Sequence, residues 1–226
     1  MSSTYLALCD KLRNEVGVPG TISSVTGQTG MFAKLITWIA DADIDINNEW
    51  SDWGFLHASF SDETILATKD ITAPTDLGLW DKDSFYLDYS SATYQKLKYL
   101  DYFIWRDSYR NGVKTNDKPD FIIIKPDLDL ILEPPPNDVY TITADYYKTA
   151  TRMSDNSDVS LIPTRYDRII IARAKIYYAE HEDASEVMQG AVNEYNDLMK
   201  KLQSIYLRGF ESNTKAHDDD MAVTVE

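Results

Sequence analysis

Apolar residues recur every three or four positions at both ends of the chain, a spacing typical of amphipathic helices. The pattern predicts helices over about 4–16, 30–50, 163–182 and 184–205. In the last of these, the apolar positions step alternately by four and three, as in a bundle or a coiled coil. Because each apolar stripe needs a partner, we expect the two ends of the chain to join in one helical bundle.

The middle of the chain changes to a period of two, which is typical of strands. The expected strands, each bounded by Pro, Gly, Asn or Asp, are 55–60, 64–71, 85–88, 96–106, 121–125, 128–133 and 139–148. Prolines mark turns between the last three, so we expect those strands to form an antiparallel meander with one face in water.

Together these elements predict an α+β protein. Its helical bundle would consist of residues 1–53 and 160–208, and an antiparallel β-sheet or sandwich insertion would span 54–159. Residues 209–226 are mostly polar, so we expect a flexible C-terminal arm. Large aromatic side chains on or beside the helical stripes are expected to form the structural core: Trp38, Trp50, Trp53, Tyr166 and Tyr195.

The composition is that of a folded protein without disulfides. Of the 226 residues, 43% are hydrophobic and only Cys9 is a cysteine. Cys9 lies on the apolar stripe of the first helix, so we expect a buried small hydrophobe and not a nucleophile. The sequence also lacks a signal-like start and an apolar run of 18 residues, which favours a soluble protein made in the cytoplasm.

The charge limits the possible partners. The chain has 37 acidic and 22 basic side chains and a formal net charge of −15. Such a chain repels the phosphate backbone, because affinity for DNA comes mostly from Lys and Arg that displace counterions. Sequence-specific DNA binding is therefore not expected, although the charge suits a surface past which DNA slides without adhering.

Specific chemical motifs are absent from the sequence. It contains no P-loop, dinucleotide fingerprint or zinc-binding pattern. Asp41, Asp43 and Asp45 resemble the start of a calcium loop, but Ile46 stands where glycine is required and Asp52 where glutamate is required. We therefore expect these aspartates to form a solvated helix face, and we expect no catalytic residue, metal or cofactor.

Two other functional classes remain open at this point. The five tryptophans and 15 tyrosines would suit a carbohydrate-binding β module of a phage tail or cell-surface protein, if they lay exposed in a row. A hydrolase using paired carboxylates is the other alternative, for which no spacing signal exists.

Seven short segments resemble the head-to-tail adaptor proteins of tailed bacteriophages. They are residues 25–30, 38–42, 50–56, 145–148, 161–166, 172–178 and 191–195. The resemblance covers roughly residues 3–208 and is strongest at the two helical ends.

The resemblance implies a non-enzymatic virion protein of the head-tail neck, assembled in the host cytoplasm. Such adaptors form rings, usually of twelve subunits, that bind the portal protein, extend the DNA channel and carry tail or nozzle proteins. DNA would pass through without specific binding, and twelve copies of this chain would carry −180 formal charges. Since like-charged subunits repel, we expect weak association until the portal is present.

The resemblance also implies that the C-terminal arm binds the portal. The apolar arm residues expected to take part are Phe210, Met221, Val223 and Val225. Residues 221–225 could add a strand to a neighbouring sheet edge.

Overall fold

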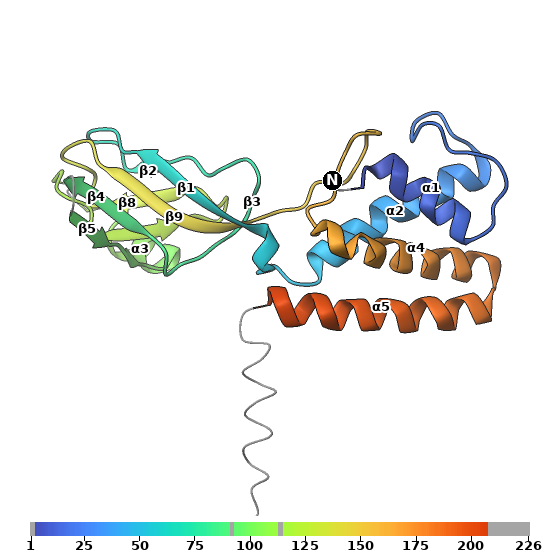
Figure 1. Ribbon diagram of the computed structural model, residues 1–226. Coiled ribbons are helices and arrows are strands. Elements are labelled where there is room, and N and C mark those ends of the chain that lie inside the picture. Colours follow the sequence, from blue (N-terminus) through green and yellow to red (C-terminus); the bar gives the residue numbers. More distant parts are fainter. Residues whose placement is uncertain (1–2, 91–92, 113–114, 208–226) are drawn as a thin grey trace, which may run out of the picture. The chain divides into compact units, whose positions relative to one another are not determined.

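The computed structural model describes residues 3–90, 93–112 and 115–207 and divides into two units (Figure 1). A helical unit draws on the chain up to Leu56 and from Ala150 onward, and a β unit spans His57–Thr149. The protein is α+β, as predicted. The β unit is shorter than the expected insertion, 54–159, because the chain after Ala150 joins the helices. The Asp158 carbonyl, for example, accepts a hydrogen bond from the Tyr5 amide at 2.7 Å.

Within residues 3–56 and 150–207, the helical unit contains four long helices and two short 3-10 turns. The helices are α1 (Tyr5–Glu15), α2 (Gly30–Asn48), α4 (Asp167–Glu182) and α5 (Ser185–Tyr206), and the turns are η1 (Gly54–Leu56) and η2 (Thr164–Tyr166). Thr4 caps α1, because its hydroxyl accepts a hydrogen bond from the Ala7 amide. α2 and α4 pack together, α1 contacts both, and α5 packs along α4 (Figure 1).

The interior of the helical unit is aliphatic. Fully buried side chains come from all four long helices and include Leu8, Cys9, Leu12, Leu35, Ile39, Ile46, Ile169, Ile170, Ala191 and Leu202. Cys9 therefore behaves as the small buried hydrophobe that its position predicts.

The aromatic side chains expected in the core differ in their burial. Trp53 is fully buried, and its indole N–H donates to the Ile46 carbonyl at 3.1 Å. Tyr166 is also buried, whereas Trp38 and Tyr195 are half-buried. The prediction is wrong for Trp50, which is 44% exposed. α2 ends at Asn48, two residues early, so Trp50 leaves the apolar stripe.

The described residues of the β unit form two sheets. The first has the order β1 (His57–Glu63), β9 (Thr141–Lys148), β4 (Tyr86–Ser90) and β5 (Thr93–Lys96), with β3 (Leu77–Trp80) also paired to β9. The second has the order β2 (Asp70–Ile71), β8 (Leu130–Glu133), β7 (Phe121–Ile124) and β6 (Lys98–Tyr99). β1 runs antiparallel to β9 in unbroken register, from His57 opposite Tyr147 to Glu63 opposite Thr141.

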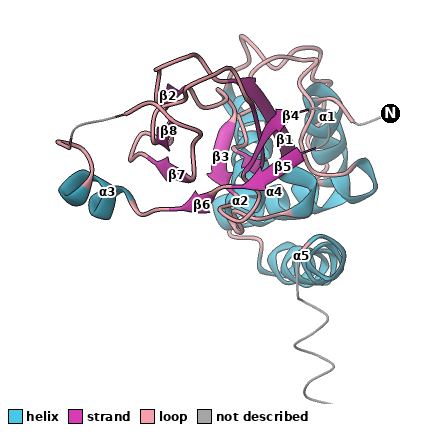
Figure 2. Ribbon diagram, turned by 90° about the vertical axis from the view of Figure 1, so that its left-hand side faces the viewer, coloured by secondary structure: helices cyan, strands magenta, loops and turns pink. Residues whose placement is uncertain are grey.

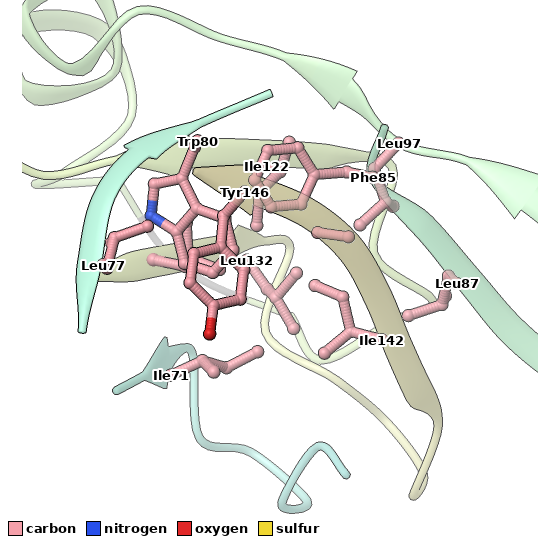
Figure 3. Packing of buried hydrophobic residues seen from close by; sticks show 12 residues of the cluster. Ile71, Leu77, Trp80, Phe85, Leu87, Leu97, Ile122, Leu132, Ile142 and Tyr146 are labelled. Carbon is pink, nitrogen blue, oxygen red and sulfur yellow. The ribbon is translucent and has the colours of Figure 1, made fainter. Parts of the chain in front are cut away.

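One apolar core joins these two sheets (Figure 3). The core residues labelled there are Ile71, Leu77, Trp80, Phe85, Leu87, Leu97, Ile122, Leu132, Ile142 and Tyr146. β9 alternates between buried and half-buried positions along most of its length, as predicted for a strand with one face against a core.

The expected meander is broken between β8 and β9. β7 and β8 pair antiparallel, but β9 pairs with β1, β3 and β4 in the other sheet. Residues 134–136 are all prolines and lack backbone donors, so they cannot extend the β8 ladder. The sheets are also not wholly antiparallel, since β6 runs parallel to β7.

A helix occupies the last part of the expected strand over 96–106. Within that range Lys96 ends β5, Lys98–Tyr99 forms β6, and α3 (Tyr102–Ser108) follows. The Asp101 carboxylate caps α3 by accepting from the amides of Phe103 and Ile104. α3 lies beside the second sheet (Figure 2), and Trp105 packs on Ile123 and Ile131. β8 is therefore buried on both faces and has no wet face.

Candidate interaction site on the helical unit

Two adjoining hollows on the helical unit form a surface that we call the acidic groove. The first hollow, of about 350 Å³, is lined by Trp38, Asp41, Ile44, Asp45 and Tyr177. The second, of about 400 Å³, is lined by Asp45, Asn48, Glu49, Arg173 and Tyr195. Asp45 belongs to both hollows, so they are two parts of one site.

Helical periodicity brings the groove residues together. Trp38, Asp41 and Asp45 follow one another on α2 at spacings of three and four, which places them on one helix face. Arg173 and Tyr177 are one turn apart on α4. Since α2 packs on α4 and α5 packs on α4, one face of each helix contributes to the groove.

Arg173 is the central cation of the groove. Its Nη2 atom donates to Asp45 Oδ2 at 2.8 Å. Its guanidinium carbon lies 5.0 Å from the ring centroid of Tyr177 and 5.6 Å from that of Tyr195, within the range of cation–π attraction. The groove therefore holds a guanidinium group by one carboxylate and two aromatic faces.

The hydrogen bonds to Asp45 control its ionisation. The Tyr177 hydroxyl donates to the same Oδ2 atom that Arg173 contacts. Burial by itself would raise the pKa of Asp45, but the hydrogen bonds from Tyr177 and Arg173 outweigh it and lower the pKa. Burial and the contact with Asp45 raise the pKa of Tyr177 to about 12. At neutral pH, Asp45 is thus a carboxylate and Tyr177 a hydrogen-bond donor.

Tyr195 and Trp38, which the sequence suggested as core residues, line this groove. The Tyr195 hydroxyl donates to Glu49 Oε2 at 3.0 Å and so connects α5 to the segment after α2. Burial, followed by the charge of Glu49, raises the pKa of Tyr195. The Trp38 ring lies 6.3 Å from that of Tyr178 and 5.6 Å from that of His181.

A second charged cluster links three helices of the same unit. Lys175 on α4 contacts Glu15 at the end of α1, at 3.0 Å, and Glu194 on α5, at 3.2 Å. Arg168, two turns earlier on α4, contacts the same two carboxylates. The alternating charges hold α1 and α5 against α4.

Asp43 corrects the expectation of a fully solvated aspartate face. Its side chain is 2% exposed, on the side of α2 that faces the chain after Ala150. The Ser160 hydroxyl donates to Asp43 Oδ1. Burial raises the pKa of Asp43 to about 6, despite this hydrogen bond. Of the neighbouring aspartates, Asp41 is half-buried and Asp45 is exposed, as expected for a solvated face.

The described part of the chain shows no other centre of chemistry. It contains no group of three or more His, Cys, Asp or Glu residues that could hold a metal ion. Burial raises the pKa of Cys9 to about 12, so its thiol stays protonated at neutral pH. In the same ranges, no helix is both long and apolar enough to cross a membrane.

The sequence signals found part of this site and missed the rest. The sequence marks the aspartates of α2 only as an incomplete calcium-loop pattern. It gives no sign that Arg173, Tyr177 and Glu49 belong to an interaction site. A like-charged pair at Asp41 and Asp45, one turn apart and next to Trp38, was the available signal, because such pairs destabilise a helix. The expected portal-binding residues lie outside the described residues: Phe210, Met221, Val223 and Val225.

Comparison with known proteins identifies the family of the chain. Residues 3–219 match the family described as SU10 adaptor protein. No curated protein matches the sequence. The family match spans nearly the whole chain and includes both the helical and the β unit. The chain therefore belongs to the SU10 adaptor protein family, a family of structural bacteriophage adaptors.

Proposed function

We propose that this protein is a head-to-tail adaptor of the virion neck. In this proposal it binds the portal protein, closes into a ring of about twelve copies, extends the DNA channel and carries tail or nozzle proteins. The observation that carries the proposal is the family match over residues 3–219. The chain would act by shape and charge and would transform no substrate.

The charge of the chain supports a role as a DNA conduit. A formal net charge of −15 on each subunit repels the phosphate backbone, so DNA would pass along the ring without adhering. The same repulsion acts between subunits, and it is screened by salt. Ring formation should therefore be favoured by the portal and by moderate ionic strength.

The C-terminal arm, residues 209–226, is proposed to hold the portal. Its apolar residues Met221, Val223 and Val225 alternate with small or polar ones, the pattern of a strand that is added to a sheet edge. Exposed edges of this kind occur in the β unit itself, where β1 and β5 end the first sheet. A portal subunit would need to offer a similar edge.

Native mass spectrometry of the chain, alone and mixed with its portal, tests the ring proposal. The expected result is a monomer or weak oligomer alone and a closed ring with the portal. A monomer in both samples would contradict it. Deletion of residues 210–226 tests the arm separately, because full retention of portal binding would exclude the arm as the anchor.

The alternative of a carbohydrate-binding β module loses the support of its tryptophans, although Tyr86, Tyr89, Tyr94 and Tyr99 of the same unit are exposed. Both tryptophans of the β unit are buried, Trp80 at 3% exposure and Trp105 at 2%. They pack inside the two apolar clusters of that unit, so they cannot form a sugar-stacking platform.

A further inference from the structure

We propose that the first hollow of the acidic groove binds an arginine side chain presented by another protein chain. This hollow has two carboxylates, Asp41 and Asp45, and two aromatic walls, Trp38 and Tyr177. Carboxylates pair with a guanidinium through parallel hydrogen bonds, and aromatic faces attract its planar cation. The hollow, of about 350 Å³, has room for one such side chain.

The second hollow shows that this surface accommodates a guanidinium. There, Arg173 of the same chain is held by Asp45 and by the faces of Tyr177 and Tyr195. Tyr177 and Asp45 also line the first hollow. Each could therefore contact Arg173 in the second hollow and a further guanidinium in the first. The first hollow repeats the chemistry of the second, with Trp38 and Asp41 in place of Tyr195 and Glu49.

The carboxylates of the first hollow keep acceptor capacity. Arg152 donates to Asp41 through Oδ1, whereas Arg173 and Tyr177 both use Oδ2 of Asp45. Those contacts therefore occupy one oxygen of each carboxylate, and a carboxylate oxygen accepts up to two hydrogen bonds. Asp41 and Asp45 lie one helical turn apart, a spacing that a guanidinium with five donors can bridge.

The same features favour arginine over lysine. A guanidinium is planar, stacks on aromatic rings and is less strongly hydrated than an ammonium group. The net charge of the chain gives the incoming cation a further long-range attraction. The inference goes beyond the proposed function, because it concerns one side-chain site and does not depend on ring size or on the portal.

A titration of the full-length chain with a small guanidinium probe tests this site. The probe is N-acetyl-arginine amide, and N-acetyl-citrulline amide is its neutral match in size. Binding is followed through the indole ¹H–¹⁵N signal of Trp38, assigned with the Trp38→Phe variant. We expect a saturable shift with a dissociation constant on the order of tens of millimolar, as for one exposed cation–π site with an ion pair. We expect the citrulline probe to bind at least about tenfold more weakly.

Two variants connect the signal to the proposed residues. Asp41→Asn keeps an acceptor oxygen for Arg152 but removes the charge, and it should weaken probe binding about two- to fivefold. Asp197→Asn removes an exposed carboxylate of α5, outside the groove, and should leave binding unchanged. A dispersed spectrum like that of the wild type shows that each variant is folded.

Three results would overturn the proposal. They are the absence of a saturable shift, equal binding of the arginine and citrulline probes, and equal effects of the two variants. N-acetyl-lysine amide, if it bound as tightly as the arginine probe, would overturn the choice of arginine. None of these measurements requires a ring or a portal. A negative result of the titration therefore does not contradict the proposed adaptor function, and a failure of ring assembly does not contradict the arginine site.

Discussion

The indole Nε1 of Trp105 donates a hydrogen bond of 2.8 Å to Oε2 of Glu133 inside the β unit. Trp105 comes from α3 and Glu133 from the end of β8, and both are buried, at 2% and 7% exposure. The bond joins α3 to the sheet that it covers. It also provides a polar partner for a buried carboxyl group, which is costly to bury without hydrogen bonds.

Replacement of Trp105 should destabilise the β unit. Trp105→Phe keeps an aromatic ring but removes the donor to Glu133, and we expect a loss of about 1–3 kcal/mol in the free energy of unfolding. Urea denaturation followed by circular dichroism measures the loss. Trp50→Phe, at an exposed position, is the matched control and should change stability by less than about 0.5 kcal/mol. Equal effects of both variants would show that the buried hydrogen bond contributes nothing.

Asp43 should make the stability of the helical unit fall as pH rises from about 4 to 6. Its pKa is about 6 in the folded chain, against an ordinary value of about 3.9. Between these values the folded state binds the proton and the unfolded state does not, so raising the pH favours unfolding. Above pH 6 the penalty is complete and amounts to about 2–3 kcal/mol.

The Asp43→Asn variant removes this pH dependence. Its stability relative to the wild type should improve between pH 4 and 6 and stay constant above that range, as measured by urea denaturation at each pH. Asp197→Asn, exposed on α5, is the control and should follow the wild type throughout. A constant difference between Asp43→Asn and the wild type from pH 4 to 7 would contradict the raised pKa.

Two glycines should respond oppositely to alanine. At Gly78, in β3, a Cβ atom would lie 3.1 Å from three backbone atoms of residues 147–149, so Gly78→Ala should cost about 1–3 kcal/mol. At Gly190, inside α5, a Cβ would meet nothing within 4 Å. Gly190→Ala should therefore stabilise the protein by about 0.5–1 kcal/mol, through helix propensity alone. Thermal unfolding of both variants measures the two changes, and a stabilised Gly78→Ala would refute the close approach of β3 to β9.

Lys175 should be important for the packing of α1 and α5 on α4. Lys175→Met removes the cation between Glu15 and Glu194 and should cost about 1–2 kcal/mol, since the side chain is 16% exposed and Arg168 still contacts both carboxylates. Lys200→Met, exposed on α5, is the control. The cost should shrink in 1 M salt, and an unchanged cost there would point to lost packing instead of lost charge.

The helices were predictable because their signals are local. The apolar stripes placed all four long helices to within a few residues. The pairing of strands was less predictable, because it depends on partners far apart in the chain. Nothing around Val139 or Tyr140 indicates that β9 pairs with β1, about 80 residues earlier.

The errors have identifiable physical causes. At Tyr102, tertiary packing and the Asp101 cap favoured a helix where the alternating pattern predicted a strand. The acidic groove could not be predicted from the sequence, because it too depends on tertiary packing. Its parts come from α2, α4 and α5, and only the folded chain brings Arg173 next to Asp45.

The contact of the Tyr5 amide with the Asp158 carbonyl has a consequence for synthesis on the ribosome. The first turn of α1 cannot form its hydrogen bond with Asp158 until more than 150 residues have been translated. The β unit, His57–Thr149, is one continuous segment and is complete before that point. We therefore expect the β unit to fold first during translation, while the N-terminal helices wait for the C-terminal half of their own unit.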